Sequence, residues 1–360
     1  MILKDELMIE ILRSGALESQ HVGSVAVVDF DGQLLASVGD PDRHSFMRSS
    51  VKPVQALPTF MDDSCMKRFK FTSTERAFMM SSHNAERAHQ AVGAEIQRKI
   101  GVTNENMGCG IHPPLYKPTA DEMMRNHEEY TPLCNNCSGN HLVMLALSVH
   151  RGWDITDYIN PEHPYQQEVL KWMSLLTAIP SKKIKIGMDN CSVPAYNLTL
   201  KQMALIFARM SVPEKLCKLP NPYRLDLTKA SNVIRRIIAD FWAQPYIIGG
   251  TGRICTWLNK TGKGTFWSKA GAEGMQLIGV VDKGIGIAVK IIDGDRGTRA
   301  KPTAVIETLR QLGLVDEKQI KTAGNLYMPD LPNLRGFDAQ TVHPRFKLKK
   351  YPAWNKHFSI

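Results

Sequence analysis

Ser49 and Lys52 are three residues apart in the pattern Ser-x-x-Lys, and Pro53 follows directly. If a helix begins here, residues three apart face the same side, so the Ser49 hydroxyl can meet the Lys52 amine. Pro53 fits only in the first turn of such a helix, which puts Ser49 beside free N–H groups that could stabilise an oxyanion. A serine hydroxyl is a poor nucleophile until a base takes its proton, and a lysine can serve when burial and a nearby cation lower its pKa. The pattern alone is weak, because Ser64 and Lys67 match it too and a solvated helical turn explains either copy.

Two more short motifs favour the catalytic interpretation. Residues 82–84 (Ser-His-Asn) have the form Ser-x-Asn, and residues 269–271 (Lys-Ala-Gly) have the form Lys-x-Gly. Together with Ser-x-x-Lys they occur in the same chain order as the three motifs of serine β-lactamases and penicillin-binding proteins. The spacing differs, since the Ser-x-Asn motif follows the first serine more closely than in the β-lactamases.

The motifs suggest different roles for the two lysines. We expect Lys52 to be neutral and to activate Ser49. Lys269 is expected to stay cationic and to deliver, through Ser82, a proton to the departing ammonia.

The segments around these motifs predict a sheet made from both ends of the chain. SVAVVDF and QLLASVG are strand-like runs joined by Asp31-Gly32, the dipeptide that a tight primed turn prefers. LIGVVD and IGIAVKII flank Lys283-Gly284 in the same way, with alternating β-branched residues. Tight turns join antiparallel strands, so the sheet is expected to be at least partly antiparallel.

The middle of the chain is mostly helical by the spacing of its apolar residues. The predicted helical stretches are 73–100, 141–152, 162–178, 200–210 and 230–241, and a closing helix is predicted at 302–312. The stretch 325–351 is expected to be irregular. We expect an α+β fold with one two-lobed catalytic domain over 1–350: a helical lobe at roughly 53–245, a sheet lobe from 1–48 and 246–346, and a tail at 351–360. A site is expected where the helical lobe meets the sheet edge.

Composition argues against several other classes of protein. The N-terminus is charged throughout and lacks the apolar stretch of a secretory signal, and the densest apolar run, Leu142–Val149, is far shorter than a membrane span. The net charge of +10 invites a nucleic-acid interpretation, but the basic residues are spread along the chain. The one basic cluster begins at Arg345, near the C-terminus. We therefore expect a cytoplasmic protein that binds neither membranes nor nucleic acid.

The cysteines are candidates for metal binding. There are seven, scattered along the chain, which favours free thiols or metal ligands over a disulfide framework. Cys134 and Cys137 form a Cys-x-x-Cys pair, but no second pair stands at zinc-ribbon spacing, so a structural zinc is not the default expectation. Cys191 lies in a loop-like segment that also offers Asp189. The acidic candidates for a site are Glu18, Asp189 and Glu273.

Taken together, these residues resemble one family, the rhizobial-type L-asparaginases, also called asparaginase II or class 3. The blocks that carry the resemblance are, in chain order, Arg13-Ser14-Gly15, Glu18-Ser19 with His21, Gly39-Asp40-Pro41, Phe46–Pro53, Ser82-His83, Cys109-Gly110 with His112-Pro113, Asn136–Gly139 with His141, Gly187–Asp189 with Cys191, Gly252-Arg253, Lys269–Gly274, and Lys290 with Asp293-Gly294. The resemblance covers about 13–346, and so many blocks in order make it specific.

The resemblance implies a serine β-lactamase-like fold that hydrolyses L-asparagine to L-aspartate and ammonia through an acyl-enzyme. It implies two serine–lysine pairs, Ser49 with Lys52 and Ser82 with Lys269. The candidates for binding the substrate are Arg48, His83, Asp189 and Glu273. Members of the family are typically homodimers.

The resemblance also implies a zinc ion beside the site, held by two cysteines and a lysine. The cysteines correspond to Cys137 and Cys191, but the lysine position is Asn140 in this chain. An amide oxygen is a harder and weaker ligand for zinc than an amine. A second departure is Ala85, where the family usually carries glycine, and this change is expected to narrow the pocket.

Two alternatives remain open on the sequence. One is another serine amidase on the same fold, such as a glutaminase or a β-lactamase-like enzyme. The other is a zinc- or nucleic-acid-binding protein that kept the scaffold and lost its activity, which the change at Asn140 makes conceivable.

Overall fold

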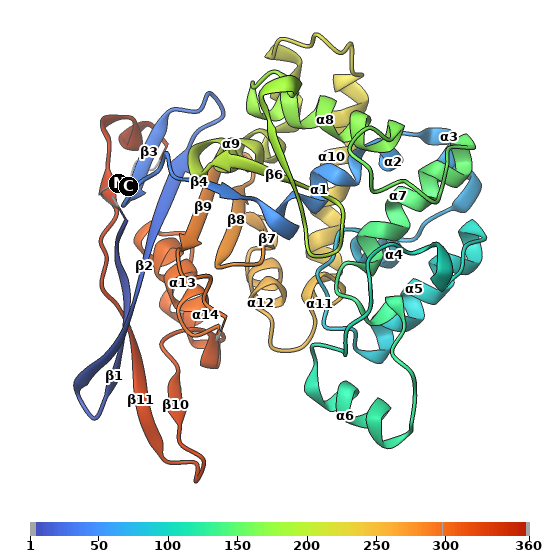
Figure 1. The fold of residues 1–360 in the computed structure, drawn as a ribbon. Helices are drawn as coiled ribbons and strands as arrows, with labels where there is room; N and C mark the ends of the chain where they lie inside the picture. Colours follow the sequence, from blue (N-terminus) through green and yellow to red (C-terminus); the bar gives the residue numbers. More distant parts are fainter. Residues whose placement is uncertain (1–4, 297, 358–360) are drawn as a thin grey trace. The chain divides into compact units, whose positions relative to one another are not determined.

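A computed structural model describes residues 5–296 and 298–357, and the chain divides into two compact units. Unit 1 comprises Met1–Ser50, Leu198–Val212 and Gly264–Ile360, and unit 2 comprises Val51–Asn197 and Pro213–Lys263. Figure 1 shows the elements of both, coloured along the sequence. That the two units make one catalytic domain stays a prediction.

Unit 1 is built on an antiparallel sheet of nine strands among the described residues. Its path runs β10-β11-β1-β2-β9-β8-β7, and β3 pairs with both β2 and β12 (Figure 1). The strands are β1 (Glu6–Arg13), β2 (Ala16–Val28), β3 (Leu34–Val38), β7 (Phe266–Ala270), β8 (Met275–Val280), β9 (Ile285–Ile291), β10 (Asp330–Pro332), β11 (Asp338–Pro344) and β12 (Lys349–Lys350), and the short β4 (His44–Phe46) belongs to the same unit. The predicted α+β class, with an antiparallel sheet drawn from both ends of the chain, is confirmed.

Helix α9 (Leu200–Ser211) lies directly on this sheet because two glycines leave room for it. A Cβ atom at Gly286 would stand 1.8 Å from the Ala204 carbonyl oxygen, and one at Gly279 would stand 2.2 Å from Ser211 Oγ. Any larger residue would push the helix away from the strands. The other helices of unit 1 are α13 (Lys301–Gln311), which contacts β1, β8, β9 and β11, and α14 (Glu317–Lys321).

Unit 2 is mostly helical. Its helices are α1 (Lys52–Gln55), α2 (Leu57–Phe60), α3 (Asp63–Phe69), α4 (Ser73–Met79), α5 (Arg87–Ile100), α6 (Lys117–Arg125), α7 (Ser138–Arg151), α8 (Pro164–Thr177), α10 (Leu227–Ala243), α11 (Pro245–Gly249) and α12 (Ile254–Thr261). Strand β5 (Lys185–Met188) pairs antiparallel with β6 (Pro194–Thr199). Helix α7 is the core of the unit, since every residue from 138 to 148 is buried. None of the described helices is long and apolar enough to cross a membrane.

The structure differs from the sequence prediction in several stretches. The helix predicted at 73–100 is two helices, α4 and α5, separated by the loop 80–86, where Ala85 has a φ of +58°. The stretch 325–351 is not irregular, because it contains β10, β11 and β12. Residues 352–356, predicted as part of a tail, form a 3₁₀ turn with Trp354 buried.

The first predicted hairpin is present, but its turn is longer than the expected two residues. Strand β2 ends at Val28 and β3 begins at Leu34. The Asp29 carboxylate accepts the backbone N–H groups of Asp31 and Gln33, at 3.0 and 2.8 Å. This side-chain bonding stabilises a wider turn, a role that aspartate commonly plays.

Candidate active site

A continuous helical stretch carries the Ser-x-x-Lys motif. Residues Arg48–Val51 form a 3₁₀ turn, α1 begins at Lys52, and Pro53 lies in its first turn, as predicted. The chain passes from unit 1 to unit 2 after Ser50, so Ser49 belongs to unit 1 and Lys52 to unit 2. Because only three residues separate them, covalent geometry keeps their Cα atoms within about 10 Å of each other.

In unit 2, the Lys52 amine is buried against Ser82. Lys52 Nζ lies 3.1 Å from Ser82 Oγ, and only 2% of Lys52 is exposed. The amine also donates to the carbonyl oxygens of Ser81, at 2.7 Å, and Asn136, at 3.3 Å. A lysine and a serine hydroxyl from two separate motifs are therefore within proton-transfer distance.

Ser82 lies in the loop 80–86, and His83 fixes this loop from inside. His83 Nδ1 accepts the Ala85 N–H at 3.0 Å, so the proton is on Nε2, which donates to Ser138 Oγ at 2.9 Å. The ring is fully buried, and burial lowers the pKa of His83 well below its usual value. With both nitrogens occupied, this geometry favours a role in positioning the loop, while the predicted contact with substrate stays a prediction.

Glu86, which no sequence motif singled out, anchors a second loop to the first. Its carboxylate accepts the N–H and hydroxyl of Thr251, both at 2.7 Å, and the hydroxyl of Tyr246 at 3.1 Å. Asn84 Nδ2 donates to the Thr251 carbonyl at 2.9 Å. A Cβ atom at Gly250 would stand 2.6 Å from Glu86 Oε1, so only glycine lets the two loops approach. In the sequence, Glu86 is marked only by its position two residues after the Ser-x-Asn motif. A single acidic residue at that position is too little to predict its role.

Cys137 and Cys191 form a buried pair at the start of α7. The hydrogen bond from the Cys191 thiol lowers the pKa of Cys137 to about 5 against the effect of burial. The pKa of Cys191 is raised by the same bond and by burial. Cys191 is therefore the donor of the pair, and Cys137 is the more acidic thiol. Cys134, the other half of the Cys-x-x-Cys motif, packs instead with Ala85 in a separate apolar cluster.

Asn140 has an unusual environment for a buried amide. Its side chain is fully buried, and neither Oδ1 nor Nδ2 has a hydrogen-bond partner among the described residues. It lies in the first turn of α7, three residues after Cys137, and helical side chains lean toward the N-terminus of the helix. Leaving such groups unpaired costs about 1–3 kcal/mol each, so the position suits a bound ligand.

Whether these residues hold a metal ion stays a prediction. The described residues contain no group of three or more His, Cys, Asp and Glu side chains able to hold a metal, so a third ligand would have to be the amide oxygen of Asn140. Two cysteine sulfurs and one amide oxygen are a usable donor set for zinc, although the oxygen is a weaker ligand than an amine.

In unit 1, the Lys-x-Gly motif lies against the backbone that precedes Ser49. A Cβ atom at Gly271 would stand 2.5 Å from the Met47 carbonyl oxygen, so this contact requires glycine. Lys269, two residues before Gly271, is fully buried at the end of β7. The Gly271–Met47 contact brings the strand of Lys269 beside the turn of Ser49 within one unit.

Of the remaining candidates for binding the substrate, Arg48 and Glu273 belong to unit 1 and Asp189 belongs to unit 2. Arg48 has a left-handed backbone, with a φ of +52°, in the turn that carries Ser49. The exposed Glu273 has its carbonyl hydrogen-bonded by Lys290, whose pKa is lowered by burial. Asp189 belongs to unit 2, where its charge acts on the buried cysteine pair.

Glu18 and the second Ser-x-x-Lys copy, Ser64 with Lys67, make their hydrogen bonds and ion pairs with residues outside the three motifs. Glu18 is on the exposed part of β2 and pairs with Arg13 at 2.9 Å. Ser64 donates to Asp62 Oδ1 at 2.6 Å at the start of α3, while Lys67 is exposed. The second Ser-x-x-Lys copy is therefore a solvated helical turn.

Comparison with known proteins gives one family. The family model described as L-asparaginase II matches residues 9–344. Among curated proteins, no sequence matches the chain significantly.

Several solved structures are similar at low identity. One described as "Crystal Structure Analysis of Mglu in its native form" is 15% identical, with a TM-score of 0.37, over 82% of this chain and 65%, less than two thirds, of that chain. "Crystal structure of Bacillus glutaminase in the presence of 4.3M NaCl" is 11% identical, with a TM-score of 0.38, over 81% of this chain and 91% of that chain.

Proposed function

Because the chain belongs to the L-asparaginase II family, an amidohydrolase family, we propose that it hydrolyses the side-chain amide of L-asparagine to L-aspartate and ammonia. The observation that carries the proposal is the buried contact between Lys52 Nζ and Ser82 Oγ, at 3.1 Å. Lys52 is three residues after Ser49 in the chain. Such a serine–lysine arrangement serves acyl transfer, because the amine can move protons to and from the hydroxyls around it.

In the proposed reaction, Ser49 is the nucleophile. Lys52, in its neutral form, takes the hydroxyl proton as Ser49 Oγ attacks the amide carbon. The developing oxyanion is stabilised by backbone N–H groups at the helix start. Lys269, as a cation, supplies through Ser82 the proton with which ammonia leaves. Water then cleaves the aspartyl ester and restores the serine.

The substrate's α-amino and α-carboxylate groups need charged partners. Arg48 is next to the nucleophile and can pair with the carboxylate. Glu273 and Asp189 are the acidic candidates for the amino group. His83 stays a candidate by the resemblance, with the buried geometry favouring its indirect role.

We propose that zinc binds Cys137, Cys191 and Asn140. The unpartnered amide of Asn140 and the lowered pKa of the buried Cys137 support this, and a bound zinc would supply a Lewis acid beside the substrate. Metal analysis after dialysis against zinc should find about one zinc per chain. Cys191→Ser should lose it, whereas Cys217→Ser, at an exposed thiol, should keep it. A wild-type protein that holds no zinc would refute this part.

We further propose a cytoplasmic homodimer that binds the small-molecule substrate and no nucleic acid. The support is the family resemblance and the dispersed positive charge. Light scattering that finds a monomer at working concentration, or retardation of DNA at moderate salt, would contradict this.

The function is tested by ammonia release from asparagine, glutamine and a β-lactam. We expect turnover of asparagine, a loss of about 10³-fold or more in kcat for Ser49→Ala, and wild-type activity for Ser64→Ala, the matched serine of the second motif. Faster turnover of glutamine would make the chain a glutaminase. Turnover in Ser49→Ala equal to wild type would discard Ser49 as the nucleophile.

A further inference from the structure

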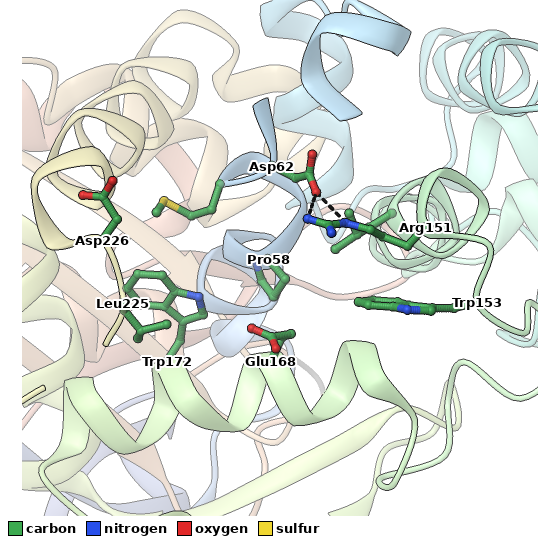
Figure 2. A pocket seen from close by; sticks show the side chains of 10 residues that line it. Pro58, Asp62, Arg151, Trp153, Glu168, Trp172, Leu225 and Asp226 are labelled. Carbon is green, nitrogen blue, oxygen red and sulfur yellow. Dashed lines mark hydrogen bonds and ion pairs between the residues drawn. The ribbon is translucent and has the colours of Figure 1, made fainter. Parts of the chain in front are cut away.

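A cavity in unit 2 shares no lining residue with the candidate active site. It encloses about 260 Å³, and its apolar walls include Pro58, Trp153 and Trp172 (Figure 2). Its polar lining residues are Asp62, Glu168, Asp226 and Arg151. Three carboxylates face one guanidinium, so the lining is acidic on a chain whose net charge is +10.

One of the three carboxylates is already compensated. Arg151 Nε donates to Asp62 Oδ2 at 2.7 Å, and Figure 2 shows this pair at the edge of the cavity. Asp62 also accepts the Cys65 N–H, at 2.8 Å, and the Ser64 hydroxyl, at 2.6 Å. Burial acts to raise the pKa of Asp62, but these bonds lower it to about 2. Asp62 and Arg151 are therefore a fixed, neutral part of the wall.

The other two carboxylates have no cationic partner among the residues that line the cavity. Asp226 Oδ1 accepts the backbone N–H of Lys229 at the start of α10, at 2.9 Å, which is a bond to a neutral group. Glu168 is drawn in Figure 2 between the rings of Trp153 and Trp172. Its partner is Lys171, at 2.6 Å, in a pair whose side chains are 38% and 37% exposed. An ion pair this exposed is weak and can be replaced by a ligand.

We propose that this cavity binds a small organic cation, with an ammonium or guanidinium group on a compact apolar body. Glu168 is the anchor for the charge, and Asp226 adds to the field that attracts it. Indole rings are the best aromatic partners for a cation and also cover an apolar body. The volume suits a ligand, or the part of a ligand, of amino-acid size.

Lys171 competes with the proposed ligand for the Glu168 carboxylate. Removing its charge should strengthen binding, whereas removing the charge of Glu168 should weaken it. A purely apolar pocket would respond to neither change.

The test is calorimetric titration of the full-length protein at low salt with benzylammonium and with its neutral counterpart, benzyl alcohol. We expect benzylammonium to bind about 10-fold more tightly than the alcohol, and Glu168→Gln to lose about 10-fold in affinity. Lys171→Met should tighten binding by about 2- to 5-fold. Trp153→Leu should weaken it, and Glu162→Gln, at an exposed carboxylate outside the lining, should leave it unchanged.

Three outcomes would overturn the proposal. These are equal affinity for the alcohol and the ammonium, unchanged binding in Glu168→Gln, or no binding of benzylammonium at millimolar concentration. Thermal melting of each variant shows that it is folded before titration, and both Glu168→Gln and Lys171→Met alter partly exposed side chains. The test is independent of the proposed hydrolysis, because it measures binding in a cavity that shares no lining residue with the candidate active site.

Discussion

Ser82 stands between a buried amine and the protein backbone, with Lys52 Nζ at 3.1 Å and its own N–H bonded to the Ile248 carbonyl at 3.1 Å. The backbone bond holds the loop, and the hydroxyl lies within proton-transfer distance of the Lys52 amine. Ser82→Ala should therefore lower kcat for asparagine by about 10²-fold or more, the usual contribution of a proton relay.

The control for Ser82→Ala is Ser174→Ala. Ser174 is 7% exposed, Ser82 is 6% exposed, and Ser174 lies on α8. Steady-state kinetics should show near wild-type kcat for this variant. Equal losses in the two variants would mean that Ser82 matters only for packing.

The motif residues could be chosen as candidates from the sequence because each motif is a short pattern of residue types at fixed spacing. Ser49 with Lys52 and residues 82–84 are such patterns. The contact between Lys52 and Ser82 joins one residue from each of the two expected pairs, Ser49 with Lys52 and Ser82 with Lys269, and these pairs stay predictions. Glu86 could not be predicted, since its partners Thr251 and Tyr246 lie far along the chain. The burial of His83 depends equally on other elements, because its ring stacks on Phe78 and His89.

Helix α7 places Cys137 and Asn140, and its position against α4 depends on one missing side chain. A Cβ atom at Gly139 would stand 1.9 Å from the Phe78 carbonyl oxygen. Gly139→Ala should therefore destabilise the protein by about 3 kcal/mol or more, because a backbone atom cannot give way as a side chain can.

Urea unfolding measures this loss. The control is Gly108→Ala, where the nearest atom to a Cβ is the Tyr158 hydroxyl at 3.4 Å, and its free energy of unfolding should change by less than about 1 kcal/mol. Equal stability of Gly139→Ala and wild type would contradict the close contact of α7 with α4.

Elements with local partners were predictable, and those with distant partners were not. The two hairpins join neighbouring segments, so their strands show in the sequence as alternating residues around a turn. Strand β11 pairs with β1, which lies more than 300 residues earlier in the chain. No pattern within residues 338–344 indicates this pairing. The break between α4 and α5 was missed because apolar residues recur at helical spacing on both sides of the loop at 80–86, although residues 81–84 are all polar.

The whole molecule should lose stability in mild acid, because buried histidines must charge when it unfolds. Burial lowers the pKa of His141 to about 3 and lowers that of His83 well below its usual value. In the unfolded chain both titrate near 6.5. Their folded pKa values are the lower ones, so unfolding takes up protons below pH 6.5 and stability falls as the pH falls.

Each histidine loses about 1.4 kcal/mol between pH 7.5 and 5.5, most of it below pH 6.5, so the two together lose about 3 kcal/mol. Cys137, whose pKa is lowered to about 5, adds a loss of the same sign over this range. Urea unfolding at these pH values measures it. Carboxylates such as Asp62, with its pKa of about 2, lose their contribution only below about pH 4, outside this range. The exposed His127 is the control, since His127→Gln should leave the pH dependence unchanged. Equal unfolding free energies at pH 7.5 and 5.5 would refute the prediction.

The most direct test of the proposed hydrolase is to find the acyl group. Wild-type protein is mixed with asparagine, quenched in acid within the first turnovers, and digested for peptide mass mapping. We predict an aspartyl ester on the peptide that contains Ser49, absent in Ser49→Ala and present in Ser64→Ala. An adduct on another residue, or full turnover by Ser49→Ala with no adduct at all, would contradict the proposal.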